Sequence, residues 1–277
     1  MTSPAPDAPP AASAEPGKGA PLLEAFRQTG AVARAELRKV ARDPTEIFSR
    51  SVQPILWLLV FGQVFARTHA IPTGQLDYLA FMTPGILAQS VLFTGIFYGI
   101  AIIWERDLGI IHKLLVSPAF RGALVLGKAL TASVRAAIQG AVIYVVAALL
   151  HVHLQLTLPS VLGVLLAVGL GGAIFSTFSL VIACLVKTRE RFMGIGQVLT
   201  MPLFFASSAI YPVDIMPGWL RVVSRLNPLT YLVDLMRGLM VHGGRSELGV
   251  ASDVAVLVAV LTVLVAIAAR LYPTVVR

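Results

Sequence analysis

Six long apolar runs limit what this chain can fold into. They occupy about residues 47–66, 78–103, 130–151, 159–186, 192–211 and 252–271. Each approaches the length of about 20 residues that an α-helix needs to cross the hydrocarbon core of a bilayer. Because lipid offers no hydrogen-bond partners to an open backbone, spans of this kind must be helical. The sequence therefore predicts an all-α polytopic membrane protein with six transmembrane helices.

The composition agrees with this class. Hydrophobic residues make up 57% of the chain and charged residues 13%, whereas soluble domains average roughly 25% charged residues. In a soluble protein the net charge of +8 would indicate a nucleic-acid partner. Here the basic residues gather between the apolar runs, where they act as topology signals. We therefore expect the lipid bilayer, and not nucleic acid, as a partner.

Lysine and arginine are distributed unevenly between the two sides that six spans define. Of the 22 basic residues, 17 fall in the N-terminal segment, the second and fourth connections and the C-terminal end. The other five are Arg67 and four arginines in or just beyond the fifth connection. Because cytoplasmic loops carry the excess of Lys and Arg, both termini are predicted to be cytoplasmic, in a multi-pass protein of the cytoplasmic (inner) membrane.

Two segments precede the first run. Residues 1–20 are rich in Pro and Ala and lack the bulky apolar side chains that offset ordering entropy, which predicts a disordered tail. The remainder, 21–277, then forms one transmembrane domain. From about 21 to 42, apolar residues follow one helical face and arginines the other, which is typical of an amphipathic helix on the membrane surface. A solvated helix packed on a partner is the alternative.

The stretch 200–237 begins inside the fifth run and leads towards the sixth, and three of its prolines are expected to break or kink the helix. Pro212, Pro217 and Pro228 each remove an amide donor and disfavour helix in the preceding residue. Between these breaks, apolar residues recur at helical spacing. The pattern predicts two short amphipathic helices that lie in, or dip into, a membrane face. On the second helix, Asp234 and Arg237 are three residues apart, so they can form an ion pair.

The connection between the second and third runs, residues 104–128, mixes charged and apolar residues. Glu105, Arg106 and Asp107 cluster where the second run ends, and a short amphipathic segment follows as far as Pro118. A partly apolar helix of mixed charge on the cytoplasmic side is suited to docking a soluble partner. An ordinary interfacial loop is the alternative.

Motifs for covalent chemistry or metal binding are weak. The sequence GALVLGKA, ending at Ala129, resembles a phosphate-binding loop, but alanine replaces the hydroxyl that holds magnesium. We therefore expect this chain to hold no cofactor and not to bind ATP by itself. His151 and His153 lack a carboxylate partner and make a poor metal site. No hydrolase motif is present in the sequence, so we expect the chain not to be an enzyme.

The polar residues inside the runs include several glutamines. Acidic residues are absent away from the ends of the runs, which argues against coupling to protons or sodium. The glutamines that are candidates for a substrate path are Gln53, Gln89, Gln139 and Gln197. Hydrogen bonding between helices is the alternative role for them.

Two stretches together resemble the ABC-2 family of ATP-binding-cassette transport permeases, particularly its daunorubicin-resistance-type branch. The first match consists of Thr200, Leu203, Ala206-Ser207, Ala209, Met216-Pro217, Pro228-Leu229-Thr230-Tyr231 and Arg237. The second consists of Glu105-Arg106-Asp107, Gly109, Leu114-Leu115, Ser117-Pro118 and Arg121. Ile110 stands where the family commonly has threonine, a minor departure.

The resemblance implies a permease that pairs with an identical or homologous permease and with two copies of a nucleotide-binding ATPase subunit. The residues it implies for ATPase coupling are Glu105, Arg106, Asp107, Gly109, Leu114, Leu115, Ser117, Pro118 and Arg121. It also implies a re-entrant hairpin at the outer mouth, with Pro212, Pro217, Trp219, Pro228, Tyr231, Asp234 and Arg237. The expected activity is export of an amphipathic or hydrophobic drug, lipid or glycan-lipid. An ion-coupled secondary transporter, a membrane-embedded enzyme and a ligand sensor are the rival hypotheses.

Overall fold

The computed structural model describes residues 45–69, 71–107, 121–186 and 188–271. Its helices are α2 (Thr45–Leu56), the π-helical turn η1 (Trp57–Gly62), α3 (Gln63–Thr68), α4 (Tyr78–Asp107), α6 (Arg121–Leu149), α7 (Leu158–Leu185), α8 (Arg189–Phe205), the 3-10 turn η2 (Val213–Ile215), α9 (Gly218–Leu226), α10 (Pro228–Met240) and α11 (Val250–Leu271). Within those ranges the only β-type pairing is one isolated bridge, between Leu154 and Val241. The all-α prediction is confirmed for this part of the chain. The predicted tail 1–20 and surface helix 21–42 lie outside it.

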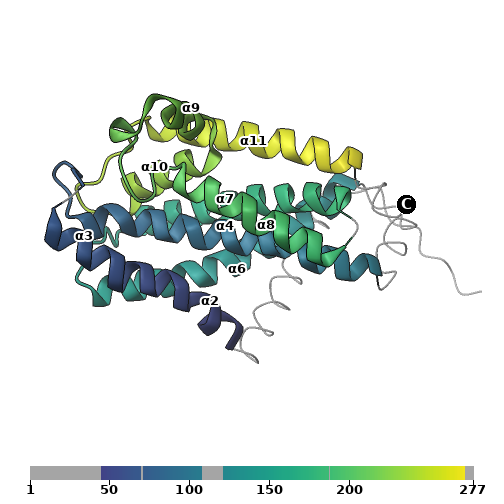
Figure 1. Ribbon diagram of the computed structural model, residues 1–277, viewed down its shortest axis with the longest axis horizontal. Coiled ribbons are helices and arrows are strands. Elements are labelled where there is room, and N and C mark those ends of the chain that lie inside the picture. The colour runs from purple at the N-terminus through teal and green to yellow at the C-terminus, as the bar shows by residue number, and fades with distance from the viewer. Residues whose placement is uncertain (1–44, 70, 108–120, 187, 272–277) are drawn as a thin grey trace, which may run out of the picture.

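Consecutive long helices alternate in direction, so their connections gather at two ends of an elongated bundle (Figure 1). One end holds the connections that follow α3 and α6, together with α9 and α10. We call it the hairpin end. The opposite end holds the end of α4, the start of α8 and the end of α11. This alternation is the arrangement that antiparallel spans in a membrane require.

Four helical segments in the described ranges are long and apolar enough to cross a bilayer. They are Tyr78–Ile100, Ala132–Leu149, Leu158–Leu185 and Val250–Leu271. They correspond to four of the six predicted spans. The predicted run 47–66 falls within α2, η1 and α3, which follow one another without a gap. The predicted run 192–211 is shorter as a helix, because α8 ends at Phe205.

Helix α4 lies at the centre of the bundle. Its residues 80–92 are all buried. It packs against α6, α7, α8 and α10. Gly95 and Gly99 lie on α4 where it packs against α7. A Cβ added to Gly95 would lie 2.6 Å from the Cβ of Phe175, and the amide of Gly99 donates to the Ser179 hydroxyl at 3.0 Å. Because these glycines have no side chain, the backbones of α4 and α7 come into direct contact.

The substitution Gly95→Ala tests this contact. We expect it to lower the free energy of unfolding by about 1–3 kcal/mol, because the new methyl group overlaps the Phe175 side chain. Gly194→Ala in α8 is the matched control, because nothing lies within 4 Å of a Cβ at that position. Thermal unfolding of the purified protein should separate the two variants. Equal stability would contradict the packing described for α4 and α7.

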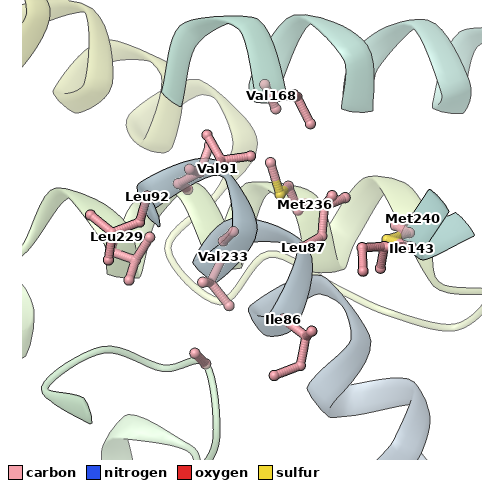
Figure 2. Close-up of a cluster of buried hydrophobic side chains, with 14 of the residues drawn as sticks. Ile86, Leu87, Val91, Leu92, Ile143, Val168, Leu229, Val233, Met236 and Met240 are labelled. Atoms are coloured by element: carbon pink, nitrogen blue, oxygen red, sulfur yellow. The ribbon is translucent and has the colours of Figure 1, made fainter. Parts of the chain in front are cut away.

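Helix α10 lies inside the apolar core (Figure 2). Leu229, Val233, Met236 and Met240 on α10 belong to the same buried cluster as Leu87 on α4. The sequence predicted a short amphipathic helix that lies in, or dips into, a membrane face, and in the structure no residue of α10 is exposed. The reason is that α4, α7 and α11 all pack against α10, so its polar side as well as its apolar side is enclosed by protein.

Candidate functional site

Asn227 joins the end of α8 to the start of α10. Its side-chain amide donates to the backbone oxygens of Leu203 at 2.6 Å and Ala206 at 3.2 Å. These carbonyl groups lie at the C-terminal end of α8, where the last carbonyls of a helix have no amide partner within the helix. Its Oδ1 accepts from the amide of Leu229 at 3.0 Å, which caps the N-terminus of α10. Because one buried side chain serves both helix ends, the return of the chain into the core is fixed at this point.

An ion pair lies inside the hairpin end. Arg237 and Asp234 are each 3% exposed, and Nη1 of Arg237 is 3.9 Å from Oδ1 of Asp234. Nη2 of Arg237 donates to the backbone oxygen of Ser208 at 2.6 Å, and its guanidinium lies 3.9 Å from the ring centroid of Phe81. Burial lowers the pKa of Arg237 to about 10, against the opposing attraction of Asp234 and Glu247. The group therefore stays charged at neutral pH, and the predicted pairing is confirmed.

The same carboxylate reaches the connection before α11. Oδ2 of Asp234 accepts from the amide of Leu248 at 2.9 Å and from the hydroxyl of Ser246 at 3.1 Å. The Ser246 hydroxyl also lies 2.8 Å from Oδ2 of Asp253, in the first turn of α11. Asp253 is fully buried. Asp234 thus links α10 to the segment that leads into α11.

Helix α9 is placed differently from α10. Its apolar residues Trp219, Val222 and Leu226 are 70%, 60% and 80% exposed, while Ser224 is buried and lies 3.1 Å from the hydroxyl of Thr230. The apolar face therefore points away from the rest of the protein. In a membrane protein such a face fits contact with lipid at the edge of the hydrocarbon.

The start of α4 is attached to the hairpin. The Tyr78 hydroxyl donates to the backbone oxygen of Ile210 at 3.1 Å, and the backbone of Ala209 leaves no room for a Cβ at Gly85. Phe81, between them on α4, forms the ring contact with Arg237. The far end of this 30-residue helix carries the segment predicted to couple to an ATPase. One helix therefore connects both motif regions.

The remaining predicted hairpin residues lie around these contacts. Pro212 and Pro217 flank the short turn η2, and Pro228 is the first residue of α10. The Tyr231 hydroxyl donates to the backbone oxygen of Arg225 at 2.7 Å, which ties α10 to α9. The hairpin residues are thus brought together, and of them Pro217 and Trp219 are exposed.

At the opposite end, most of the predicted coupling residues lie outside the described part of the chain. The backbone of α4 extends to Asp107 and that of α6 begins at Arg121. The side chains of Glu105, Arg106, Asp107 and Arg121, and all of residues 108–120 with Gly109, Leu114, Leu115, Ser117 and Pro118, are not among the described groups. Beside them, the guanidinium of Arg189 lies 3.6 Å from the ring centroid of Trp104, which joins the ends of α4 and α8.

The four predicted substrate-path glutamines occupy different environments. Gln139 is buried and donates to the hydroxyl of Ser51 at 2.9 Å, a bond between α6 and α2. Gln89 is buried in α4, with no hydrogen-bond partner for either atom of its amide among the described residues. Gln53 and Gln197 are exposed on α2 and α8. The structure does not bring the four into one site.

The model of the ABC-2 type transporter family matches residues 27–241, a region that includes the hairpin and the segment between α4 and α6. The chain belongs to this family. As a member of the ABC-2 family it is a membrane-embedded transport permease, in line with its four long apolar helices in the described ranges.

Three relatives illustrate the family's range. The transport permease ycf38 of Cyanophora paradoxa is 32% identical over 210 residues, covering 74% of this chain and 71% of the relative. The daunorubicin resistance ABC transporter permease protein DrrB1 of Streptomyces coeruleorubidus is 26% identical over 208 residues, covering 72% and 70%. Nodulation protein J of Rhizobium leguminosarum bv. trifolii is 31% identical over 169 residues, covering 60% and 63%.

Sequence reasoning missed three residues of the hairpin end, namely Asn227, Ser246 and Asp253. Asn227 precedes a proline at a helix start, which is a known capping signal. Asp253 stands in the first turn of a helix, a position in which Asp and Glu are enriched. No local signal marks Ser246, because its role depends on two carboxylates from different helices.

Proposed function

We propose that this ABC-2 permease is the membrane-spanning subunit of an ATP-binding-cassette exporter. Its substrate is an amphipathic or hydrophobic drug, lipid or glycan-lipid, which leaves across the cytoplasmic membrane with ATP hydrolysed by a separate subunit. The observation that carries this proposal is the family match over 27–241. One relative is named for daunorubicin resistance, which supports export of a small molecule. The apolar surfaces of the spans favour a cargo with apolar parts.

The proposed topology has six spans and two cytoplasmic termini. To the four spans identified by length and composition it adds α2–α3 and α8. The hairpin end then faces outward, and the opposite end, with the connection 104–128, faces the cytoplasm. The excess of Lys and Arg on the second side supports this orientation.

The proposed assembly contains two permease chains, identical or homologous, and two ATPase subunits that bind ATP and magnesium. The coupling residues between Glu105 and Arg121 dock on the ATPase, together with the helix predicted at 21–42. The chain itself performs no covalent step. It converts differences in contact between two states of the assembly into a change of access.

Helix α4 provides the mechanical link in this mechanism. At ~1.5 Å per residue it extends over roughly 45 Å, from the coupling segment to the contacts of Tyr78, Phe81 and Gly85 with the hairpin. When ATP closes the partner ATPases, movement of the cytoplasmic end of α4 displaces its outer end. Because α10 is packed against that end, the hairpin shifts and the substrate path opens outward.

Purification of the tagged chain from its native membrane tests the proposed assembly. We expect a soluble ATPase with a complete phosphate-binding loop to copurify in a 1:1 ratio, in a complex whose mass fits two copies of each subunit. Recovery of the permease with no ATPase, in a detergent that keeps membrane complexes intact, would contradict the proposed partner.

A further inference from the structure

The Ser246 hydroxyl lies between two carboxylates and has too few protons for both. Its Oγ is 3.1 Å from Oδ2 of Asp234 and 2.8 Å from Oδ2 of Asp253, and it accepts from the amide of Gly249 at 2.8 Å. A serine hydroxyl donates one hydrogen bond only, and an ionised carboxylate donates none. If both carboxyl groups were ionised, one of the two contacts would therefore join two oxygens with no proton between them.

One additional proton satisfies the whole cluster. A protonated Asp253 donates to Ser246, whose own proton then goes to Asp234, and the second lone pair of Ser246 remains for Gly249. The reverse assignment is unfavourable, because Asp234 already accepts from Leu248 and lies beside the Arg237 cation, and both contacts favour its ionised form. Oδ1 of Asp253, in contrast, is buried with no hydrogen-bond partner among the described residues.

The surrounding charges support the same assignment. Arg237 on α10 is the cation that faces the cluster, and it is paired with Asp234. Glu247 in the preceding connection adds a further acidic group, and burial with the nearby Asp234 raises its pKa. Helix α7, which also packs on α11, carries Cys184 near its opposite end as its only ionisable side chain. Helix α6 also packs on α11 and carries Arg135 and Tyr144. The connection before α11 carries the exposed His242 and Arg245, and neither forms an ion pair with Asp253 among the described residues.

We propose that Asp253 binds a proton at neutral pH, and that this proton joins the first turn of α11 to α10 through Ser246. The cluster is then a proton-binding site in which Asp234 is the ionised member and Asp253 the neutral one. This inference rests on the local geometry of the hairpin end and does not depend on the transport activity.

Two isosteric substitutions should have opposite effects on the full-length protein. Asp253→Asn keeps a neutral group that can donate to Ser246, so we expect its unfolding temperature at neutral pH to equal or exceed that of the wild type. Asp234→Asn leaves the buried Arg237 without its counter-ion, so we expect a decrease of about 10 °C. Asp77→Asn, at an exposed carboxylate before α4, is the matched control and should change nothing.

The pH dependence has a defined sign. The folded protein holds a proton that an unfolded aspartate, with a pKa of roughly 4, has released, so rising pH favours unfolding of the wild type. Asp253→Asn cannot lose this proton. The unfolding temperature of the variant minus that of the wild type should therefore increase as the pH rises from about 4, whereas Asp77→Asn should give no such trend.

Infrared spectroscopy of the purified protein at neutral pH detects the proton directly. We expect a carboxylic-acid carbonyl band that disappears in Asp253→Asn and remains in Asp77→Asn. Absence of that band in the wild type, or a loss of stability in Asp253→Asn as large as in Asp234→Asn, would overturn the proposal. Either result would mean that both carboxyl groups are ionised and are bridged by water or a cation.

Discussion

Replacing Arg237 with methionine is expected to lower the free energy of unfolding by about 3–5 kcal/mol and to abolish transport. The substitution keeps much of the side-chain volume but leaves the buried Asp234 carboxylate without its cation. Removing only one partner of a buried ion pair is strongly destabilising, because the remaining charge is buried without a counter-ion. It also removes the bond to the Ser208 backbone and the contact with Phe81. Thermal or denaturant unfolding in detergent gives the stability, and substrate efflux gives the activity.

The control lies in the same hairpin. Arg225→Met removes an exposed arginine of α9 and should change stability by less than about 0.5 kcal/mol. The double substitution Asp234→Asn with Arg237→Met removes both charges, so it should be less destabilising than the sum of the two single changes. If the single and double effects were simply additive, the ion pair would not be the source of the loss.

Charge reversal at Glu105 and Arg106 is expected to separate ATP hydrolysis from transport. These residues belong to the segment proposed to receive the movement of the ATPase, and a coupling free energy of ordinary size corresponds to a decrease in transport of about tenfold. Membrane insertion and the ATPase activity of the partner should remain. The measurement is the ratio of substrate exported to ATP hydrolysed in reconstituted vesicles.

Arg67→Glu provides the comparison for this pair. Arg67 is an exposed residue at the hairpin end, in the last turn of α3, so its charge should not affect docking at the cytoplasmic end. Undiminished transport after both Glu105→Lys and Arg106→Glu would show that this segment does not couple the permease to the ATPase.

Periodicity predicted the short helices of the hairpin and the pairing of Asp234 with Arg237, because both are local properties of neighbouring residues. The burial of α10 could not be predicted in this way. Its polar side is satisfied by groups distant in sequence, namely the backbone of Ser208, the ring of Phe81 and the hydroxyl of Ser246. A helix that looks amphipathic can therefore be enclosed when the protein supplies partners for its polar face.

The roles of the glutamines also depend on residues distant in sequence, so the sequence alone could not assign them. The sequence left open whether they line a path or join helices, and the structure gives Gln139 a partner on another helix, Ser51. Gln53 and Gln197 lie on outer faces of α2 and α8, where only the surroundings of the chain in its assembly would define their role. A role in the substrate path thus stays a prediction for Gln53, Gln89, Gln139 and Gln197.

The most direct test of the proposed function is transport by the purified permease in liposomes, with and without its ATPase subunit. We predict export of an amphipathic substrate only when the ATPase, ATP and magnesium are all present, with no effect of collapsing the ion gradients. Transport by the permease alone, driven by a proton or sodium gradient, would contradict the account and identify a secondary transporter.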